Sequence, residues 1–277
     1  MPYRTACLSF VAGLLRVFAV ISMFWLAACS GDEKEVYQAR PVDEIYNDAL
    51  NKLQAGNPAE AALGFEEVER QHPYSSWARK SQVMASYAYY LANKYDDAVL
   101  AGERFLQLHP GNEDAPYVFY LIGISYYEQI TDVGRDQRIT ELALKSLGEV
   151  VERYPNSEYA RDARLKIDLT RDHLAGKEME IGRYYQSRAN YAAAINRFRF
   201  VIENFQTTTH VPEALHRLTE SYLALGVERQ AQTAAAVLGH NFPGSDWYRD
   251  SYALLTGRGL EPESDEGSWL SRLTDLL

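Results

Sequence analysis

The sequence is poor in cysteine, with two in 277 residues. Cys7 lies in an N-terminal apolar segment that we expect to be removed, so Cys29 is the one cysteine that a mature chain would keep. A single cysteine cannot form a disulfide within its own chain, which excludes a disulfide framework. Runs in which valine or isoleucine alternates with polar residues are also missing, whereas alanine, leucine, glutamate and arginine recur throughout. The sequence therefore predicts an all-α protein.

Motifs of catalysis and of nucleic-acid binding are missing as well. The chain contains no GxSxG, no HExxH, no glycine-rich phosphate loop and no Cys–His pair. His210 and His216 are close in sequence but lack a further ligand nearby, so we expect no metal site. The formal net charge is −10, and no basic patch offsets it, which argues against nucleic acid as a partner. We expect a binding protein without enzymatic activity or cofactor.

Residues 1–28 have the character of a secretory signal. A short basic start precedes the apolar residues 17–28, a stretch shorter than a membrane-spanning helix requires. The segment ends in LAAC, with the cysteine at Cys29, and resembles the cleavage box of bacterial lipoproteins. That resemblance implies diacylglycerol on the thiol and an acyl chain such as palmitate on the new amino group. Ser30, where an aspartate would favour inner-membrane retention, indicates the outer membrane. The alternative is a plain signal peptide with an incidental cysteine.

One helical repeat occurs five times along the chain. An alanine marks the same position in each copy: Ala61, Ala98, Ala143, Ala194 and Ala231. A helix-stopping residue follows each alanine at a fixed distance: Pro73, Pro110, Pro155, Gln206 and Pro243. This is the register of the tetratricopeptide repeat, in which a small residue lets two antiparallel helices touch and a proline closes the second helix. The pattern predicts an α-solenoid of five tetratricopeptide-like helical hairpins, an architecture that forms binding surfaces.

Two irregularities interrupt the array. Extra residues delay the third alanine, and they form the charged loop 130–137. Further residues precede the fourth alanine, and residues 156–189 are typical of one long connecting helix with Gly176 as its weakest point. We therefore expect a removed lipoprotein signal at 1–28, a flexible tether at 29–42, repeats one to three at 43–155, the long helix with repeats four and five at 156–257, and an acidic linker with a short amphipathic tail at 258–277. The tail, with Trp269 on its apolar face, either docks on a partner or the membrane, or folds back on the repeats.

Tyrosines concentrate on one predicted groove. They occupy first-helix positions of the first three repeats: Tyr46, Tyr87, Tyr90, Tyr117, Tyr120 and Tyr127. The last two repeats place polar residues at such positions instead: Arg183, Gln186, Glu213, His216 and Glu220. Tyrosine offers a large contact area and a hydroxyl for backbone groups, so the groove suits an extended peptide with aromatic side chains. The alternative is that these rings pack between adjacent helices.

Several segments together resemble the BamD family, the tetratricopeptide lipoproteins of the beta-barrel assembly machinery. They are the cleavage box, RPVDEIYNDAL at 40–50, FEEVERQHPYSSWA at 65–78, GRDQ at 134–137, RYPNSEYA at 153–160 and RYYQSRANYAAAINRF at 183–198. The resemblance covers nearly all of the chain and implies a non-catalytic role in inserting barrel proteins into the outer membrane, on its periplasmic face. It implies binding to a BamA POTRA domain, to other Bam lipoproteins, and to the C-terminal targeting strands of unfolded outer membrane proteins. By the same resemblance, Arg197 and Arg199 of repeat four are candidate BamA contacts.

Two other interpretations stay open. The chain could be a periplasmic tetratricopeptide lipoprotein adaptor in cell-wall synthesis or in Tol-Pal coordination. It could also be a lipid-anchored hydrolase, which would require a polar cluster in a cleft; no such cluster is recognisable in the sequence.

Overall fold

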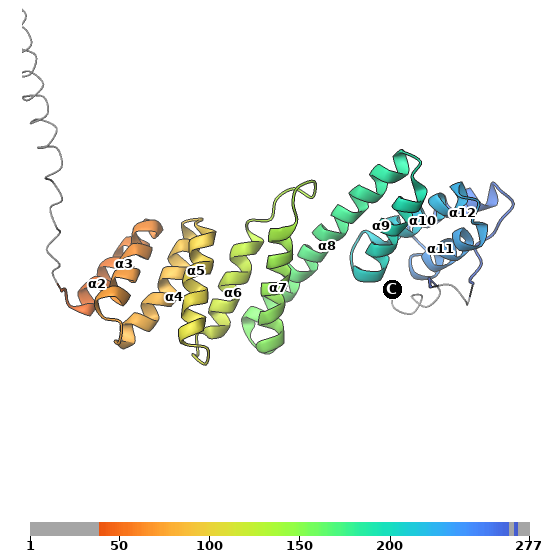
Figure 1. Cartoon of the computed structure of the whole chain (residues 1–277). Helices are drawn as coiled ribbons and strands as arrows, with labels where there is room; N and C mark the ends of the chain where they lie inside the picture. The colour runs from red at the N-terminus through yellow and green to blue at the C-terminus, as the bar shows by residue number, and fades with distance from the viewer. Residues whose placement is uncertain (1–38, 266–268, 271–277) are drawn as a thin grey trace, which may run out of the picture. The chain divides into compact units, whose positions relative to one another are not determined.

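Helical hairpins make up the protein. The computed structural model describes residues 39–265 and 269–270, and every regular element within them is an α-helix (Figure 1). In chain order the helices are α2 (Val42–Gln54), α3 (Pro58–Gln71), α4 (Ser76–Leu91), α5 (Tyr95–Leu108), α6 (Ala115–Tyr127), α7 (Arg138–Arg153), α8 (Glu158–Ser187), α9 (Tyr191–Asn204), α10 (Val211–Ala224), α11 (Glu228–Asn241) and α12 (Asp246–Thr256). Each helix packs on the next in sequence from α2 to α11, and α12 packs on α10 and α11. The expected all-α solenoid of five tetratricopeptide-like hairpins with one long connecting helix is confirmed.

The repeat alanines are the points at which paired helices touch. All five are fully buried. In repeat two, the hydroxyl of Ser86 on α4 donates a hydrogen bond of 2.8 Å to the carbonyl of Ala98 on α5. In repeat three, a methyl group added at Gly123 would lie 2.7 Å from Cδ2 of Leu147, so a larger residue there would force Leu147 or the helices α6 and α7 to shift. Close packing of this kind is what the small residues permit.

The second helix of each hairpin ends two residues before the predicted stopping position. The residues that follow these helices share one backbone conformation, with φ between −129° and −136°: His72, His109, Tyr154, Phe205 and Phe242. Helix α9 ends in the same way although Gln206 replaces the proline. The proline therefore reinforces a stop that the local packing already fixes.

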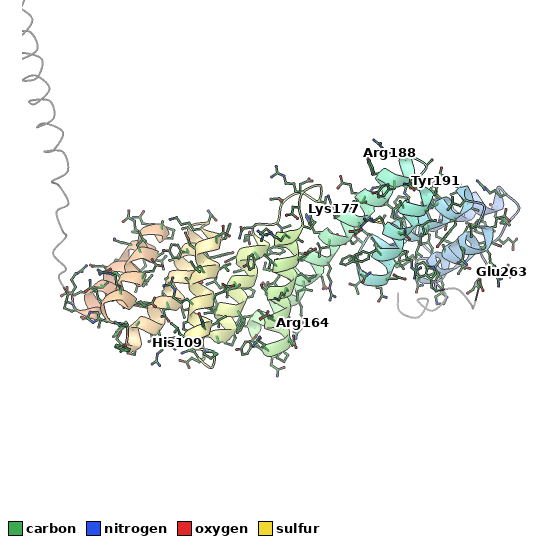
Figure 2. All side chains as sticks on the ribbon, viewed as in Figure 1. His109, Arg164, Lys177, Arg188, Tyr191 and Glu263 are labelled. Atoms are coloured by element: carbon green, nitrogen blue, oxygen red, sulfur yellow. The ribbon has the colours of Figure 1, made fainter. Side chains whose placement is uncertain are left out.

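The long helix α8 is held from both sides by loops. It begins two residues later and ends two residues earlier than the sequence predicts, and it runs unbroken through Gly176. Lys177 donates a hydrogen bond of 3.0 Å to the carbonyl of Gly134, in the charged loop between α6 and α7 (Figure 2). The carboxylate of Asp172 accepts a 2.9 Å hydrogen bond from the backbone of Thr209, in the loop after α9. These bonds tie the long helix to the repeats that precede and follow it.

Beyond α12 the chain runs back along α11. Gln232 donates a 2.8 Å hydrogen bond to the carbonyl of Glu261, and Arg229 forms a 3.0 Å ion pair with Asp265. Trp269 packs against the core of the last repeats, and Leu270 is fully buried in it. Of the two interpretations left open for the tail, the described part is folded back on the repeats. Residues 266–268 and 271–277 lie outside the described residues.

The expected signal, Cys29 and most of the tether also lie outside the described residues. Residues 41–277 form one compact unit, which contains both repeat groups expected at 43–155 and 156–257, so the boundary between those groups stays a prediction. Across the described residues, none of the helices combines the length and the apolar character that crossing a membrane requires.

Candidate functional site

Six half-buried tyrosines form what we call the aromatic face. They come from the first helices of repeats two and three and from the start of α8: Tyr87, Tyr90, Tyr117, Tyr120, Tyr127 and Tyr159. All six pack against one buried cluster built on α6, α7 and α8, which includes Leu121, Leu147 and Ala163. Five of the six predicted groove tyrosines are therefore brought together.

The rings of the aromatic face contact one another. The ring centre of Tyr117 lies 6.4 Å from that of Tyr87 and 5.4 Å from that of Tyr159. Tyr120 and Tyr159 are 5.5 Å apart, with their planes inclined by 30°. Separations of this size are those at which aromatic rings attract. The contacts fix the rings in place, so that their outer edges form a surface that is largely ordered before any ligand arrives.

Polar groups border the aromatic face at three points. The hydroxyl of Tyr120 donates a hydrogen bond to the carboxylate of Asp162, and that of Tyr90 donates to Glu128 at 3.5 Å. Burial raises the pKa of Tyr120, and the bond to Asp162 raises it further, so the phenol remains a protonated donor. The ammonium group of Lys166 lies 4.8 Å from the ring centre of Tyr127. Such a surface can bind apolar and aromatic side chains and orient them by hydrogen bonds, and it contains no activated nucleophile.

Tyr46 does not belong to the aromatic face, contrary to the sequence prediction. Its ring packs on Phe65 at 5.4 Å and on Trp77 at 4.7 Å, within the core of the first hairpins. Conversely, Tyr159 was not predicted. A recurring signal could have found it, because proline, any residue, serine, any residue and an aromatic residue occur in this order before α4, α8 and α12. Trp77 and Tyr159 hold the same place in this pattern.

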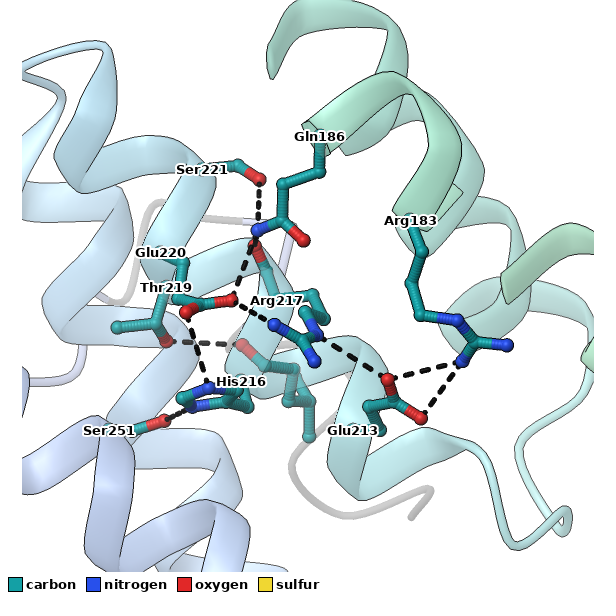
Figure 3. A network of polar contacts seen from close by, with 10 residues as sticks. Arg183, Gln186, Glu213, His216, Arg217, Thr219, Glu220, Ser221 and Ser251 are labelled. Carbon is teal, nitrogen blue, oxygen red and sulfur yellow. Dashed lines mark hydrogen bonds and ion pairs between the residues drawn. The ribbon is translucent and has the colours of Figure 1, made fainter. Parts of the chain in front are cut away.

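The last two repeats carry a polar network instead of tyrosines (Figure 3). Arg183 on α8 donates to both carboxylate oxygens of Glu213 on α10, each at 3.1 Å. Arg217 donates to Glu213 at 3.4 Å and to Glu220 at 2.8 Å, and Gln186 donates to Glu220 at 3.1 Å. The sequence predicted these first-helix positions to share one face, and the structure places their side chains in contact.

Glu220 is the most strongly perturbed carboxylate of this network. Burial alone would raise its pKa, but hydrogen bonds and charge from His216 and Arg217 lower the pKa to about 2. The Nε2 atom of His216 lies 3.6 Å from the Glu220 carboxylate, while its Nδ1 atom is 2.8 Å from the hydroxyl of Ser251 on α12. His216 is 5% exposed, so the network links the last hairpin to α12 through the interior.

The network borders a hollow of about 470 Å³. Its lining is mainly polar: Arg183, Gln186, Ser187, Tyr191, Arg217, Glu220 and Ala224. The charged side chains that face the hollow already form ion pairs with one another. The hollow therefore suits a polar surface of a partner protein, whose charged groups can replace one member of some of these pairs. Among the described residues, no three His, Cys, Asp or Glu side chains gather as a metal ion would require.

The two arginines predicted as partner contacts are both engaged within the chain. Arg197 donates a 3.0 Å hydrogen bond to Glu178 of α8. Arg199 donates to Glu203 at 2.7 Å, and its guanidinium carbon lies 4.4 Å from the ring centre of Trp269. Both side chains keep more than two fifths of their surface exposed.

Comparison with known proteins places the chain in a family. Residues 38–238 match the family model YfiO, described as outer membrane lipoprotein. The chain belongs to this family. The outer membrane protein assembly factor BamD of Caulobacter vibrioides is 52% identical, over 89% of this chain and 82% of its own length. BamD of Rickettsia prowazekii is 42% identical, over 87% of this chain and 96% of its own. BamD of Neisseria meningitidis (strain Z2491) is 34% identical, over 79% and 88%.

The family membership confirms the resemblance to BamD seen in the sequence. The matched segment of this chain runs from just before α2 to the interior of α11. It includes the aromatic face and all of the polar network except Ser251. Among solved structures, the TPR2AB domain of yeast Sti1 in its complex with pHSP90 superposes on 79% of this chain and 85% of that chain. The sequence identity is 10% and the TM-score is 0.40, a similarity too low to carry an argument.

Proposed function

We propose that the chain is a non-catalytic assembly factor for outer membrane β-barrel proteins. Its aromatic face binds the C-terminal targeting strands of unfolded barrel precursors, and its C-terminal repeats bind a POTRA domain of BamA. Diacylglycerol and an acyl chain on Cys29 hold it at the periplasmic face of the outer membrane, beside other Bam lipoproteins. The YfiO family and the names of the relatives support the assembly role.

The observation that carries the substrate proposal is the aromatic face. The rings of Tyr87, Tyr117 and Tyr120 are held by one another and by Tyr159, so little side-chain entropy is lost when a ligand binds. Burial raises the pKa of Tyr117, so its phenol stays protonated and can donate a hydrogen bond to the backbone of an extended segment. An aromatic-rich strand provides both the rings and the backbone groups that this surface accepts.

Site-specific photo-crosslinking tests the substrate proposal. A photoreactive residue at Tyr87 or Tyr120 should capture peptides that end in an aromatic barrel strand, since both positions lie in the aromatic face. The same residue at Tyr184, an exposed tyrosine outside the face, is the matched control and should not capture them. Capture of cell-wall enzymes alone would contradict the substrate proposal. It would favour the alternative interpretation, an adaptor in cell-wall synthesis or Tol-Pal coordination.

The polar network supports the partner proposal. Paired charges at Arg183, Glu213 and Arg217 offer complementary groups to a folded domain, whereas the aromatic face offers few charges. Arg197 and Arg199 on α9 are the proposed contacts to BamA. Purification of the chain from outer membranes should recover BamA with it, and Arg197→Ala should reduce that recovery. Undiminished recovery with both arginines replaced by alanine would remove them from the contact.

A further inference from the structure

An open cleft lies between the second helices of repeats two and three. It has a volume of about 310 Å³. Phe119 and Ile122 of α6 are at its apolar floor, and Leu106 of α5 adds to it, while Glu103 and Glu149 bring carboxylates to its edges. Glu149 also lines a second hollow of about 680 Å³ over the outer side of α7. The two hollows share Glu149 in their linings, and we call them together the open cleft.

The same chain fills the corresponding place between repeats four and five. There the guanidinium carbon of Arg199 on α9 lies 4.4 Å from the ring centre of Trp269, and Tyr222 of α10 packs against the same core as Trp269. The preceding segment of the tail, residues 261–265, bonds to the outer side of α11, where the hydroxyl of Thr233 donates to the carbonyl of Glu263 at 3.3 Å. We call this place the tail site. It shows what kind of ligand such a position holds: an extended segment with an aromatic and an aliphatic side chain.

The repeat register makes the two places equivalent. Arg199 comes five residues after its repeat alanine, and so does Glu103. Tyr222 and Tyr126 occupy matching first-helix positions. Burial raises the pKa of both phenols; the charge of Glu103 raises that of Tyr126 further, whereas Trp269 and Arg199 lower that of Tyr222. Each tyrosine therefore lies close to the side chain five residues after the alanine, as the register requires.

The equivalence extends to the outer side of the second helix. Thr233, which bonds to the tail, corresponds to Lys145, which lines the hollow over α7. Arg229, which pairs with Asp265 of the tail, corresponds to Glu141. The path that the tail follows along α11 thus has an unfilled counterpart along α7.

At two matching positions the charges are opposite in sign. Arg199 of the tail site corresponds to Glu103, which lines the open cleft, and Arg229 corresponds to Glu141 near the start of α7. The basic residues that line the open cleft are Lys145 and Arg153. An acidic segment such as the tail would bring Asp265 against Glu141, which like charges oppose. The tail of a second copy is therefore a poor occupant, and a segment with basic residues fits.

We infer that the open cleft is a docking site for an extended protein segment that carries an aromatic or large aliphatic side chain flanked by lysines or arginines. The apolar side chain lies over Phe119 and Ile122. The basic groups meet Glu103 and also Glu149, which exchanges its 3.5 Å ion pair with Arg153 for one with the ligand. The edges of this surface come from the second helices α5 and α7, and its floor comes from residues of α6 other than the tyrosines. It therefore differs from the aromatic face and from the polar network in the residues that line it.

Three peptides test the inference on the full-length chain in detergent. The first has the native tail sequence of residues 261–272, EPESDEGSWLSR. The second replaces its acidic residues by lysine, KPKSKKGSWLSR, and the third replaces the Trp–Leu pair of the second by two alanines. In fluorescence anisotropy the lysine peptide should bind about tenfold more tightly than either of the other two, because only it supplies both the charge and the apolar anchor.

Variants of the chain locate the binding. Gly148→Trp should weaken binding of the lysine peptide about fivefold or more, since a Cβ there has no atom within 4 Å and the indole would occupy the hollow. Glu103→Lys should weaken it by repulsion. Gly244→Trp, at another open glycine far along the sequence, is the matched control and should change nothing.

Two results would overturn the inference. One is a lysine peptide that binds no more tightly than the native tail peptide, absence of binding included. The other is tight binding that neither Gly148→Trp nor Glu103→Lys weakens. The Trp269→Ala variant is a further control. Tighter binding of the lysine peptide to that variant would show that the peptide binds at the tail site, and it would also contradict the inference.

Discussion

A serine followed two residues later by an aromatic side chain recurs at three helix starts. The pairs are Ser75 with Trp77, Ser157 with Tyr159, and Ser245 with Trp247. Each serine accepts a hydrogen bond from a backbone N–H of the first turn and so fixes the helix start. Each aromatic ring then contacts a residue of the preceding first helix: Tyr46, Tyr120 and His216. These three residues share one repeat position, three places before a small residue (Ala49, Gly123 and Thr219). One repeated device therefore supports an aromatic contact in the early repeats and a polar one in the last.

At the repeat alanine, size is the constraint. Ala194 on α9 is fully buried, whereas Ala192 on the same helix is exposed. We expect Ala194→Leu to lower the free energy of unfolding by about 1–3 kcal/mol, because added methylenes cannot be accommodated in a packed core. Ala192→Leu is the matched control and should leave stability within about 0.5 kcal/mol of the native value. Denaturant unfolding measures both, and equal midpoints for the two variants would contradict the register.

At Glu220, charge is the constraint. Its folded pKa of about 2 lies below the ordinary value of 4.5, so its stabilising effect is complete above pH 4.5 and is lost as the pH falls toward 2. Glu220→Gln should lower stability at neutral pH by an amount on the order of 2 kcal/mol. The difference between the two proteins should shrink between pH 4.5 and 2. Urea unfolding at several pH values measures it, and a difference that stays constant over this range would refute the assignment.

The long helix α8 derives its position from the loops that converge on it. A methyl group added at Gly176 would lie 3.2 Å from Nε2 of His210 and 3.3 Å from Cγ1 of Val133. Val133 belongs to the loop before α7, and His210 to the loop before α10. The sequence marks Gly176 as the weakest point of the helix, but the structure gives it a packing role. The missing side chain lets both loops approach α8 at the same turn.

Substitutions at two helix glycines distinguish the effect of side-chain packing on stability from the effect of helix propensity. Gly176→Leu should lower the free energy of unfolding by about 1–3 kcal/mol, because the side chain would displace His210 and Val133. At Gly148 on α7 an added Cβ has no atom within 4 Å, so Gly148→Leu should instead raise the free energy of unfolding by about 0.5–1 kcal/mol, through the better helix propensity of leucine. Thermal melts followed by circular dichroism compare the two. A Gly176→Leu variant that is more stable than the native chain would show that the two loops move aside, and it would contradict the packing role of Gly176.

Periodicity predicts the helices well but predicts contacts between hairpins poorly. The helix pairs, the loop 130–137 and the length of α8 follow from local spacing, and each was predicted to within a few residues. The placement of Tyr46 in the core and of Tyr159 on the aromatic face depends on how one hairpin stacks on the next. That stacking depends on side-chain packing between residues far apart in sequence. The contact between Arg199 and Trp269, which are 70 residues apart, could not be predicted from the repeat pattern for the same reason.

At the scale of the whole molecule, one repeat provides surfaces of three chemistries. First helices carry the aromatic face in repeats two and three and the polar network in repeats four and five. Second helices border the tail site and the open cleft, with opposite charges at two matching positions. Because a repeat array joins neighbouring hairpins through similar contacts, residues at the same register can change chemistry without changing the fold. A protein of this kind is suited to hold several partners at once.

Holding partners at a membrane requires the anchor that the sequence predicts at Cys29. Serine at this position cannot carry the thioether-linked diacylglycerol, so Cys29→Ser should release the chain from the membrane fraction. One acyl chain alone binds a bilayer only marginally, so loss of all the chains should leave no stable attachment. The melting temperature should not change, because Cys29 lies outside the helical repeats, which begin at Val42. Fractionation must be done in cells lacking BamA contacts, for example with Arg197 and Arg199 both replaced by alanine, since a bound partner would retain the chain. A Cys29→Ser chain that still sediments with membranes under those conditions would refute the lipid anchor.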